Sequence, residues 1–275
     1  MKNKTNVIFI LGSGRCGTYS FYKALSRVKN IEAYHEFFFE PTLRIANLYH
    51  MKRISKKEII HFLKENHLYS ITNSTKKIWV DSSNALPWIA DVLVELFPDA
   101  KFVHLIRNGK KVVSSFYNKH RDIMYNKRDI LKLIKFLNKK NKYISSEKKY
   151  WRPIPIDDYQ KLKEFLNKSQ FSKICNYWSE INLKIYHSIQ KAKNRKTFMF
   201  EDIQNEKKLF ELIRFMGIRK YDFDIIKKSF QKPVNVTIPK NIYLKNSQIK
   251  CFQKECGNSM KKFNYNNDNE YKVIY

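Results

Sequence analysis

The sequence predicts an α/β fold, a three-layer domain in which helices flank a central, mainly parallel sheet of about five strands. Two observations support this prediction. Short β-like segments alternate with helical ones along most of the 275 residues. The first strand, residues 6–11, is a continuous apolar run, which is typical of a strand buried on both faces of a parallel sheet. We expect one domain over residues 1–275, with an insertion at residues 120–168 where the pattern becomes irregular.

The expected elements follow one another in a regular order. After the first strand, a helix over residues 18–28 places Phe21, Leu25 and Val28 on one face. Further strands are expected at residues 31–34, 77–81, 101–106 and 196–200. The strand at residues 31–34, the second in the chain, should lie beside the first and point in the same direction. Further helices are expected at residues 41–50, 55–67, 86–97, 109–119, 170–192, 206–216 and 247–262.

The composition excludes several classes of protein. With 43% hydrophobic and 15% aromatic residues, the chain can bury enough apolar surface to fold. No apolar run approaches the ~18 residues of a membrane span, and no secretory signal precedes the first strand. We therefore expect a cytoplasmic protein. The cysteines form no C-x-x-C pair, so we expect no metal site.

The net charge is +29, from 54 Lys and Arg against 25 Asp and Glu. Of these basic residues 43 are Lys, and they are spread over the whole chain. Nucleic-acid surfaces favour Arg, whose planar fork binds two acceptors at once. We therefore expect solvated lysines and no nucleic-acid partner, with a basic nucleic-acid-binding protein without catalysis as one alternative. A broadly positive field also raises the rate at which anionic ligands are encountered.

The loop after the first strand, Gly-Ser-Gly-Arg-Cys-Gly-Thr at residues 12–18, has the features of an anion-binding loop. It joins a buried strand to a helix N-terminus, where backbone N–H groups and the positive end of the helix dipole converge. Gly12 and Gly17 fit the Walker A pattern G-x-x-x-x-G-K-[ST], but Thr18 stands at the lysine position. The loop supplies Arg15 as its cation instead.

A second candidate anion site follows the fourth strand. Arg107 comes directly after residues 101–106, and Ser115 follows two helical turns later. An Arg at the carboxyl end of a parallel strand is well placed to bind a phosphate beside the first site. The two sites together indicate a ligand that carries phosphates at two separate points.

At these residues the sequence resembles the sulfotransferases that use 3′-phosphoadenosine-5′-phosphosulfate (PAPS), which have a P-loop-NTPase-like fold. Arg15, Gly17 and Thr18 match the family's loop for the 5′-phosphosulfate, and Arg107 with Ser115 matches its 3′-phosphate motif. Further segments that resemble the family are residues 177–182, 198–203 and 215–218.

The resemblance implies transfer of the sulfuryl group of PAPS to an acceptor hydroxyl, with no metal and with Arg15 stabilising the leaving phosphate. The acceptor is expected to be a small molecule, a carbohydrate or a lipid, covered by the insertion at residues 120–168. The nucleotide contacts that the resemblance implies are Gly12, Ser13, Gly14, Arg15, Cys16, Gly17, Thr18, Tyr19, Arg107, Ser115 and Lys232.

The acceptor hydroxyl needs a general base. Glu36 lies 21 residues after Arg15, a spacing that resembles that of the catalytic Glu in tyrosylprotein-type members. His35 is the other candidate. Because adjacent strand residues face opposite sides of a sheet, we expect only one of the two to face the site, and Glu36 is preferred.

A different enzyme class is the main alternative. Asp81 ends an apolar strand as a Walker B aspartate does, so Arg15 and Asp81 could serve a Mg²⁺-dependent P-loop kinase acting on a small molecule or nucleotide. The missing Walker lysine argues against this alternative.

Overall fold

A computed structural model of the chain describes residues 5–120, 123–138, 152–219, 222–230 and 243–265. Within these residues, five parallel strands form one sheet in the order β2-β3-β1-β4-β5. The predicted fold class is therefore confirmed. The strands are β1 (Asn6–Gly12), β2 (Ile31–His35), β3 (Ile78–Ser83), β4 (Lys101–Ile106) and β5 (Asn194–Met199).

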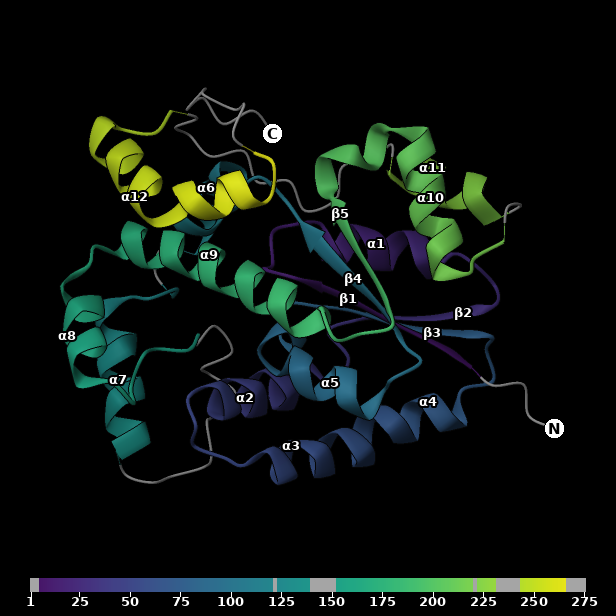
Figure 1. The fold of residues 1–275 in the computed structure, drawn as a ribbon, viewed down its shortest axis with the longest axis horizontal. Coiled ribbons are helices and arrows are strands. Elements are labelled where there is room, and N and C mark those ends of the chain that lie inside the picture. The colour runs from purple at the N-terminus through teal and green to yellow at the C-terminus, as the bar shows by residue number, and fades with distance from the viewer. Residues whose placement is uncertain (1–4, 121–122, 139–151, 220–221, 231–242, 266–275) are drawn as a thin grey trace.

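Helices cover both faces of the sheet, so the described residues form three layers (Figure 1). On one face α1 (Thr18–Leu25) packs against α11 (Phe223–Phe230), with α10 (Glu206–Met216) beside β5. On the other face α9 (Gln170–Ile189) crosses β1 and β4 and contacts α5 (Ala90–Leu96). The remaining helices are α2 (Phe39–His50), α3 (Lys56–Leu63), α4 (Tyr69–Asn73), α6 (Gly109–Lys119), α7 (Lys127–Asn138), α8 (Tyr159–Asn167) and α12 (Asn246–Lys262).

The neighbour of β2 is β3, so the prediction that the second strand lies beside the first is wrong. The predicted direction is confirmed, because β2 runs parallel to the other strands. All six residues of β3 are buried, whereas most of β2 is partly exposed. A strand that can bury both faces suits the interior of a parallel sheet, and a half-exposed strand suits its edge.

Other elements differ from the prediction near their ends. The helix expected at residues 86–97 begins as a 3₁₀ turn at Leu86–Ile89, where Pro87 has no N–H to donate, and continues as α5. The helix expected at residues 55–67 is α3 followed by a π-helical turn and α4. The sequence did not predict α11.

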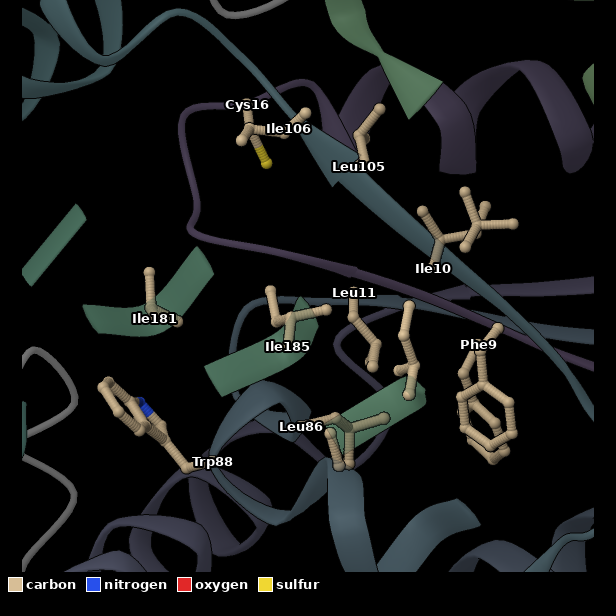
Figure 2. Packing of buried hydrophobic residues seen from close by; sticks show 14 of the residues in the cluster. Phe9, Ile10, Leu11, Cys16, Leu86, Trp88, Leu105, Ile106, Ile181 and Ile185 are labelled. Atoms are coloured by element: carbon tan, nitrogen blue, oxygen red, sulfur yellow. The ribbon is translucent and has the colours of Figure 1, made fainter. Parts of the chain in front are cut away.

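The apolar core lies on both sides of the central strands. The Phe9 ring contacts Trp79 at a centroid distance of 5.9 Å and Phe102 at 5.5 Å, which links β1 to both neighbouring strands. Full burial of one such ring contributes roughly 1.5–3 kcal/mol to the free energy of unfolding. At the carboxyl end of the sheet, the buried cluster includes Cys16 and Ile106 (Figure 2). The core thus extends directly beneath the loop after β1.

Among the described residues, the helices are all too short or too polar to traverse a lipid bilayer.

Candidate active site

The loop between β1 and α1 turns through a series of left-handed backbone conformations. Gly14, Arg15 and Gly17 have φ angles of +78°, +56° and +102°. A Cβ at Gly17 would overlap the ring of Phe200, so this position requires glycine on two counts. Within the described part of the chain, no side chain caps the N-terminus of α1 and no acidic residue lies in its first turn. The backbone N–H groups there form the kind of site that binds an anion.

The two predicted anion sites contact each other. Arg15 Nε donates a hydrogen bond to Ser115 Oγ at 2.8 Å, and Arg107 Nη1 donates to the carbonyl oxygen of Arg15 at 3.1 Å. The guanidinium of Arg107 also lies 5.1 Å from the centroid of the Phe200 ring. Since β1 and β4 are paired, their carboxyl ends bring together motifs that lie 92 residues apart in the sequence.

Arg107 also carries a polar atom suited to a ligand. Its Nε is buried and has no hydrogen-bond partner among the residues that the structure describes. A buried N–H without a partner is costly, and an anionic oxygen would satisfy it. Arg107 and the open N-terminus of α1 therefore fit a ligand with more than one anionic group.

The turn after β4 is held in place from two directions. The indole Nε1 of Trp178 donates to the carbonyl oxygen of Arg107 at 3.2 Å. Glu201 Oε1 accepts the N–H of Asn108 at 3.0 Å, while its Oε2 accepts the Tyr265 hydroxyl at 2.7 Å. The sequence placed Trp178 and Glu201 in segments that resemble the family but gave them no role. The structure shows that both fix the backbone that carries Arg107.

His35 is the last residue of β2 and Glu36 follows it directly. His35 Nε2 lies 3.4 Å from Thr18 Oγ1, and His35 Nδ1 lies 3.9 Å from Glu36 Oε2. Glu36 has a φ of +62°, and its N–H donates to the carbonyl oxygen of Ser82 at 3.2 Å. The chain therefore leaves extended geometry at Glu36, and the alternation of faces that we expected does not separate the two side chains.

Burial shifts the two candidate bases in opposite directions. It lowers the pKa of His35 to about 4, which makes the imidazole neutral and weakly basic near neutral pH. It raises the pKa of Glu36 to about 7, with the nearby charge of Arg152 acting in the opposite direction. A carboxylate with a pKa near the working pH is the more effective general base.

Two residues of the site were missed by the sequence analysis. The Asn84 side chain, just after β3, donates Nδ2–H to Glu36 Oε1 and accepts from Arg152 Nη2 at 3.4 Å. The Arg152 guanidinium lies 5.7 Å from the centroid of the Tyr177 ring. Tyr177 in turn donates its hydroxyl to the carbonyl oxygen of Ser13 at 2.9 Å. In the sequence, the one signal for Arg152 was its place close to Pro153 and Pro155 in the insertion, and no sequence signal indicated Asn84.

Positive charge gathers around Arg15. Burial and then the charge of Arg15 lower the pKa of His120 to about 4, and the same two causes lower the pKa of Lys119. Both residues lie at the end of α6, about one turn after Ser115. The surroundings of the loop therefore favour an anion.

Three other predicted residues, Tyr19, Cys16 and Asp81, differ in their burial and contacts. The ring of Tyr19 meets His35 edge-on at 5.2 Å. Cys16 is fully buried, so its thiol is not exposed to a ligand. Burial raises the pKa of Asp81 to about 7, and Oδ1 accepts the N–H of Phe37 at 3.1 Å, which supports the segment that carries Glu36. Lys232 lies outside the described residues.

A family model described as "Sulfotransferase family" matches residues 7–159. The matched segment contains the loop after β1, both candidate bases and the motif at residues 107–115. A search among curated proteins found no match.

A search among solved structures found several sulfotransferases, one of which reaches a TM-score of 0.50. A sulfotransferase from Mycobacterium avium aligns with a TM-score of 0.50 at 8% identity, covering 100% of this chain and 79% of that one. A sulfotransferase from Alicyclobacillus acidocaldarius has a TM-score of 0.47 at 13% identity and covers 94% and 95% of the two chains. A sulfotransferase domain from the curacin biosynthetic pathway has a TM-score of 0.44 at 13% identity and covers 80% and 76%.

Proposed function

Because the chain belongs to the sulfotransferase family, we propose that it transfers the sulfuryl group of PAPS to an acceptor hydroxyl. The observation that carries this proposal is the direct contact between the two anion motifs, in which Arg107 donates to the carbonyl oxygen of Arg15. The Arg107 guanidinium thus contacts the loop that leads into α1, and the Arg15 side chain of that loop bonds Ser115 of the second motif. A nucleotide with phosphates at its 3′ and 5′ positions matches that distribution of charge.

In this proposal the donor is bound mainly by groups at the carboxyl ends of β1 and β4. The loop at residues 12–18 and the N-terminus of α1 bind the 5′-phosphosulfate through backbone N–H groups, with Thr18 and Tyr19 in the first turn of the helix. Arg107 and Ser115 bind the 3′-phosphate. Lys232 remains a proposed phosphate contact by position in the sequence.

PAPS supplies an activated sulfuryl group with a phosphate as leaving group. Glu36, ionised above a pKa of about 7, accepts the proton of the acceptor hydroxyl. The hydroxyl oxygen then forms the new bond to sulfur as the bond from sulfur to the phosphate oxygen breaks. Arg15 stabilises the charge on that oxygen, in the way that fixed cations accelerate related transfers. His35, with a pKa of about 4, acts as a neutral neighbour that hydrogen-bonds Thr18.

We propose a single domain over residues 1–275, in which the insertion at residues 120–168 covers the acceptor. The described part of the insertion brings Arg152 close to Glu36, which supports this arrangement. The acceptor class in this proposal is a small molecule, a carbohydrate or a lipid that presents a hydroxyl group to Glu36.

Thermal unfolding with adenosine-3′,5′-bisphosphate tests the donor site. At about 100 times the Kd the bisphosphate should raise the Tm by roughly 5 °C, because it binds only the folded chain. The Arg107→Ala variant should lose most of this rise. Arg195→Ala is the matched control, since Arg195 pairs in register with Phe102 near the amino end of the sheet.

ATP with Mg²⁺ is the competing ligand in the same assay. Equal or greater stabilisation by ATP–Mg²⁺ would favour the kinase alternative over PAPS. Unchanged stabilisation by the bisphosphate in Arg107→Ala would show that it binds elsewhere, which would refute the proposed site.

A further inference from the structure

Arg152 is a buried cation that has no role in the reaction proposed above. Arg152 is only 5% exposed. The guanidinium lies against the face of the Tyr177 ring, and Tyr177 is anchored to the loop after β1 through Ser13. Arginine is almost never buried without partners, because the loss of hydration must be offset by specific contacts. The contacts of Arg152 therefore indicate what it does.

The chemistry of Arg152 fixes the orientation of the Asn84 amide. Guanidinium groups only donate hydrogen bonds, so the atom of Asn84 that faces Arg152 must be the oxygen. The amide nitrogen is then turned towards Glu36, to which it donates. An amide flipped the other way would set two donors against each other on one side and two acceptors on the other.

The hydrogen bonds from Arg152 to Asn84 and from Asn84 to Glu36 form a relay. The groups around Glu36 act on its ionisation in both directions. Three titratable groups besides Arg152 bear on Glu36: His35 at 3.9 Å, and Asp81 and Tyr177 through longer-range charge. Burial and the carboxyl of Asp81 oppose ionisation of Glu36. Donation from Asn84 and the positive charge of Arg152 favour it.

We propose that Arg152 is a positioning residue which, through the Asn84 amide, orients Glu36 and holds it in the ionised form that a general base requires. This inference rests on the proposed function for its purpose, but the relay itself is a property of the folded chain. It also gives the insertion a role, since the insertion supplies Arg152.

The test is a direct titration of Glu36. In protein labelled with ¹³C at the glutamate carboxyl groups, the Glu36 signal is identified by its loss in Glu36→Gln and followed against pH by NMR. Arg152→Gln should raise the pKa of Glu36 by about one, a tenfold change in proton affinity. Arg152→Lys, which keeps the charge, should restore part of the difference.

Two further variants keep the test decisive. Lys173→Gln removes a buried cation near the start of α9 and should leave the Glu36 titration unchanged. Asn84→Ala keeps Arg152 but removes the relay, and it should also raise the pKa of Glu36, so the test does not depend on whether Arg152→Gln folds. An unchanged Glu36 titration in Asn84→Ala or in folded Arg152→Gln would overturn the inference.

The titration needs no turnover and no donor, so it separates the two proposals. If Glu36 responds as expected while the bisphosphate fails to stabilise the protein, the relay stands and the donor assignment fails. If the bisphosphate stabilises the protein while Glu36 does not respond, the donor assignment stands and the relay fails.

Discussion

At the scale of single residues, the loop after β1 depends on backbone conformations and spaces that ordinary side chains cannot adopt or share. Gly17 combines a φ of +102° with direct contact to the Phe200 ring. Phe200 in turn lies beneath the guanidinium of Arg107. A change at Gly17 therefore disturbs both anion motifs through one aromatic ring.

Replacing Gly17 with alanine tests this dependence. We expect Gly17→Ala to lower the free energy of unfolding by about 2–4 kcal/mol, from the left-handed conformation and the overlap with Phe200 together. Gly257→Ala is the matched control, because a Cβ at Gly257 meets no atom within 4 Å and the residue lies inside α12. That control should stabilise the protein by up to about 1 kcal/mol. Denaturant unfolding measures both, and equal losses would contradict the argument.

Asp81 should make stability depend on pH in a defined direction. Its pKa is about 7 in the folded chain, well above the usual value of 3.8, because it is fully buried. Between these values the folded state holds a proton that the unfolded state releases, so the free energy of unfolding falls as pH rises. Asparagine does not titrate, so the free energy of unfolding of Asp81→Asn should fall less than that of the wild type as the pH rises.

Urea unfolding of both proteins at pH about 5, 6 and 7 measures the difference. Glu36 titrates in the same direction in both proteins. Loss of the Asp81 charge also removes its opposition to Glu36 ionisation, which further flattens the pH dependence of Asp81→Asn. Parallel stability profiles for wild type and Asp81→Asn would show that Asp81 is ionised throughout this range.

At the scale of elements, the site depends on how the turn between β4 and α6 is held. Trp178 on α9 and Glu201 after β5 each bind one backbone group of this turn. The two supports come from different directions, because α9 covers one face of the sheet while β5 lies beside β4 as the edge strand. The position of Arg107 thus depends on two segments outside its own, α9 and the turn after β5.

Removing Glu201 should weaken this turn. Glu201→Ala leaves the N–H of Asn108 and the hydroxyl of Tyr265 without their acceptor, so we expect a loss of about 1–3 kcal/mol in the free energy of unfolding. Asp202→Ala is the neighbouring control, since Asp202 pairs with the half-exposed Lys208 and should cost less than about 1 kcal/mol. Chemical denaturation of the two variants measures both costs, and equal values would remove the special role of Glu201.

At the scale of the whole molecule, the net charge of +29 dominates the electrostatics. Like charges on one compact surface repel, which lowers stability in dilute buffer. The same field draws anions towards the site. Added salt therefore raises stability by screening the repulsion, and it slows the encounter with anionic ligands by screening the attraction.

Stability should rise with salt. Between about 20 and 200 mM NaCl we expect the Tm to increase, because the Debye length shortens to below ~8 Å and the repulsion is screened. Arg107→Ala should keep this rise, since one charge among many is removed. A calorimetric scan of both proteins in NaCl measures it. A flat or falling Tm in the wild type would show that local ion pairs outweigh the general repulsion.

How much could be predicted depended on how far apart the contacting residues lie in the sequence. The proximity of Arg15 and Arg107 followed from the rule that parallel strands end at one edge. The neighbours of β2 were predicted wrongly, because a pattern of apolar residues does not state which strand pairs with which. Asn84 and Arg152 were missed, since they are 68 residues apart and neither belongs to a motif.

The sequence alone determined the α/β fold, the glycine-rich loop after β1 and the two arginines at strand ends, because each is encoded by residues close together in the chain. Only the tertiary structure decided that β3 separates β1 from β2, that the side chains of His35 and Glu36 approach each other to 3.9 Å, and that Arg152 reaches Glu36 through Asn84. These features arise from packing between distant segments and from burial, which shifts the pKa of a side chain according to its surroundings and not its neighbours in sequence.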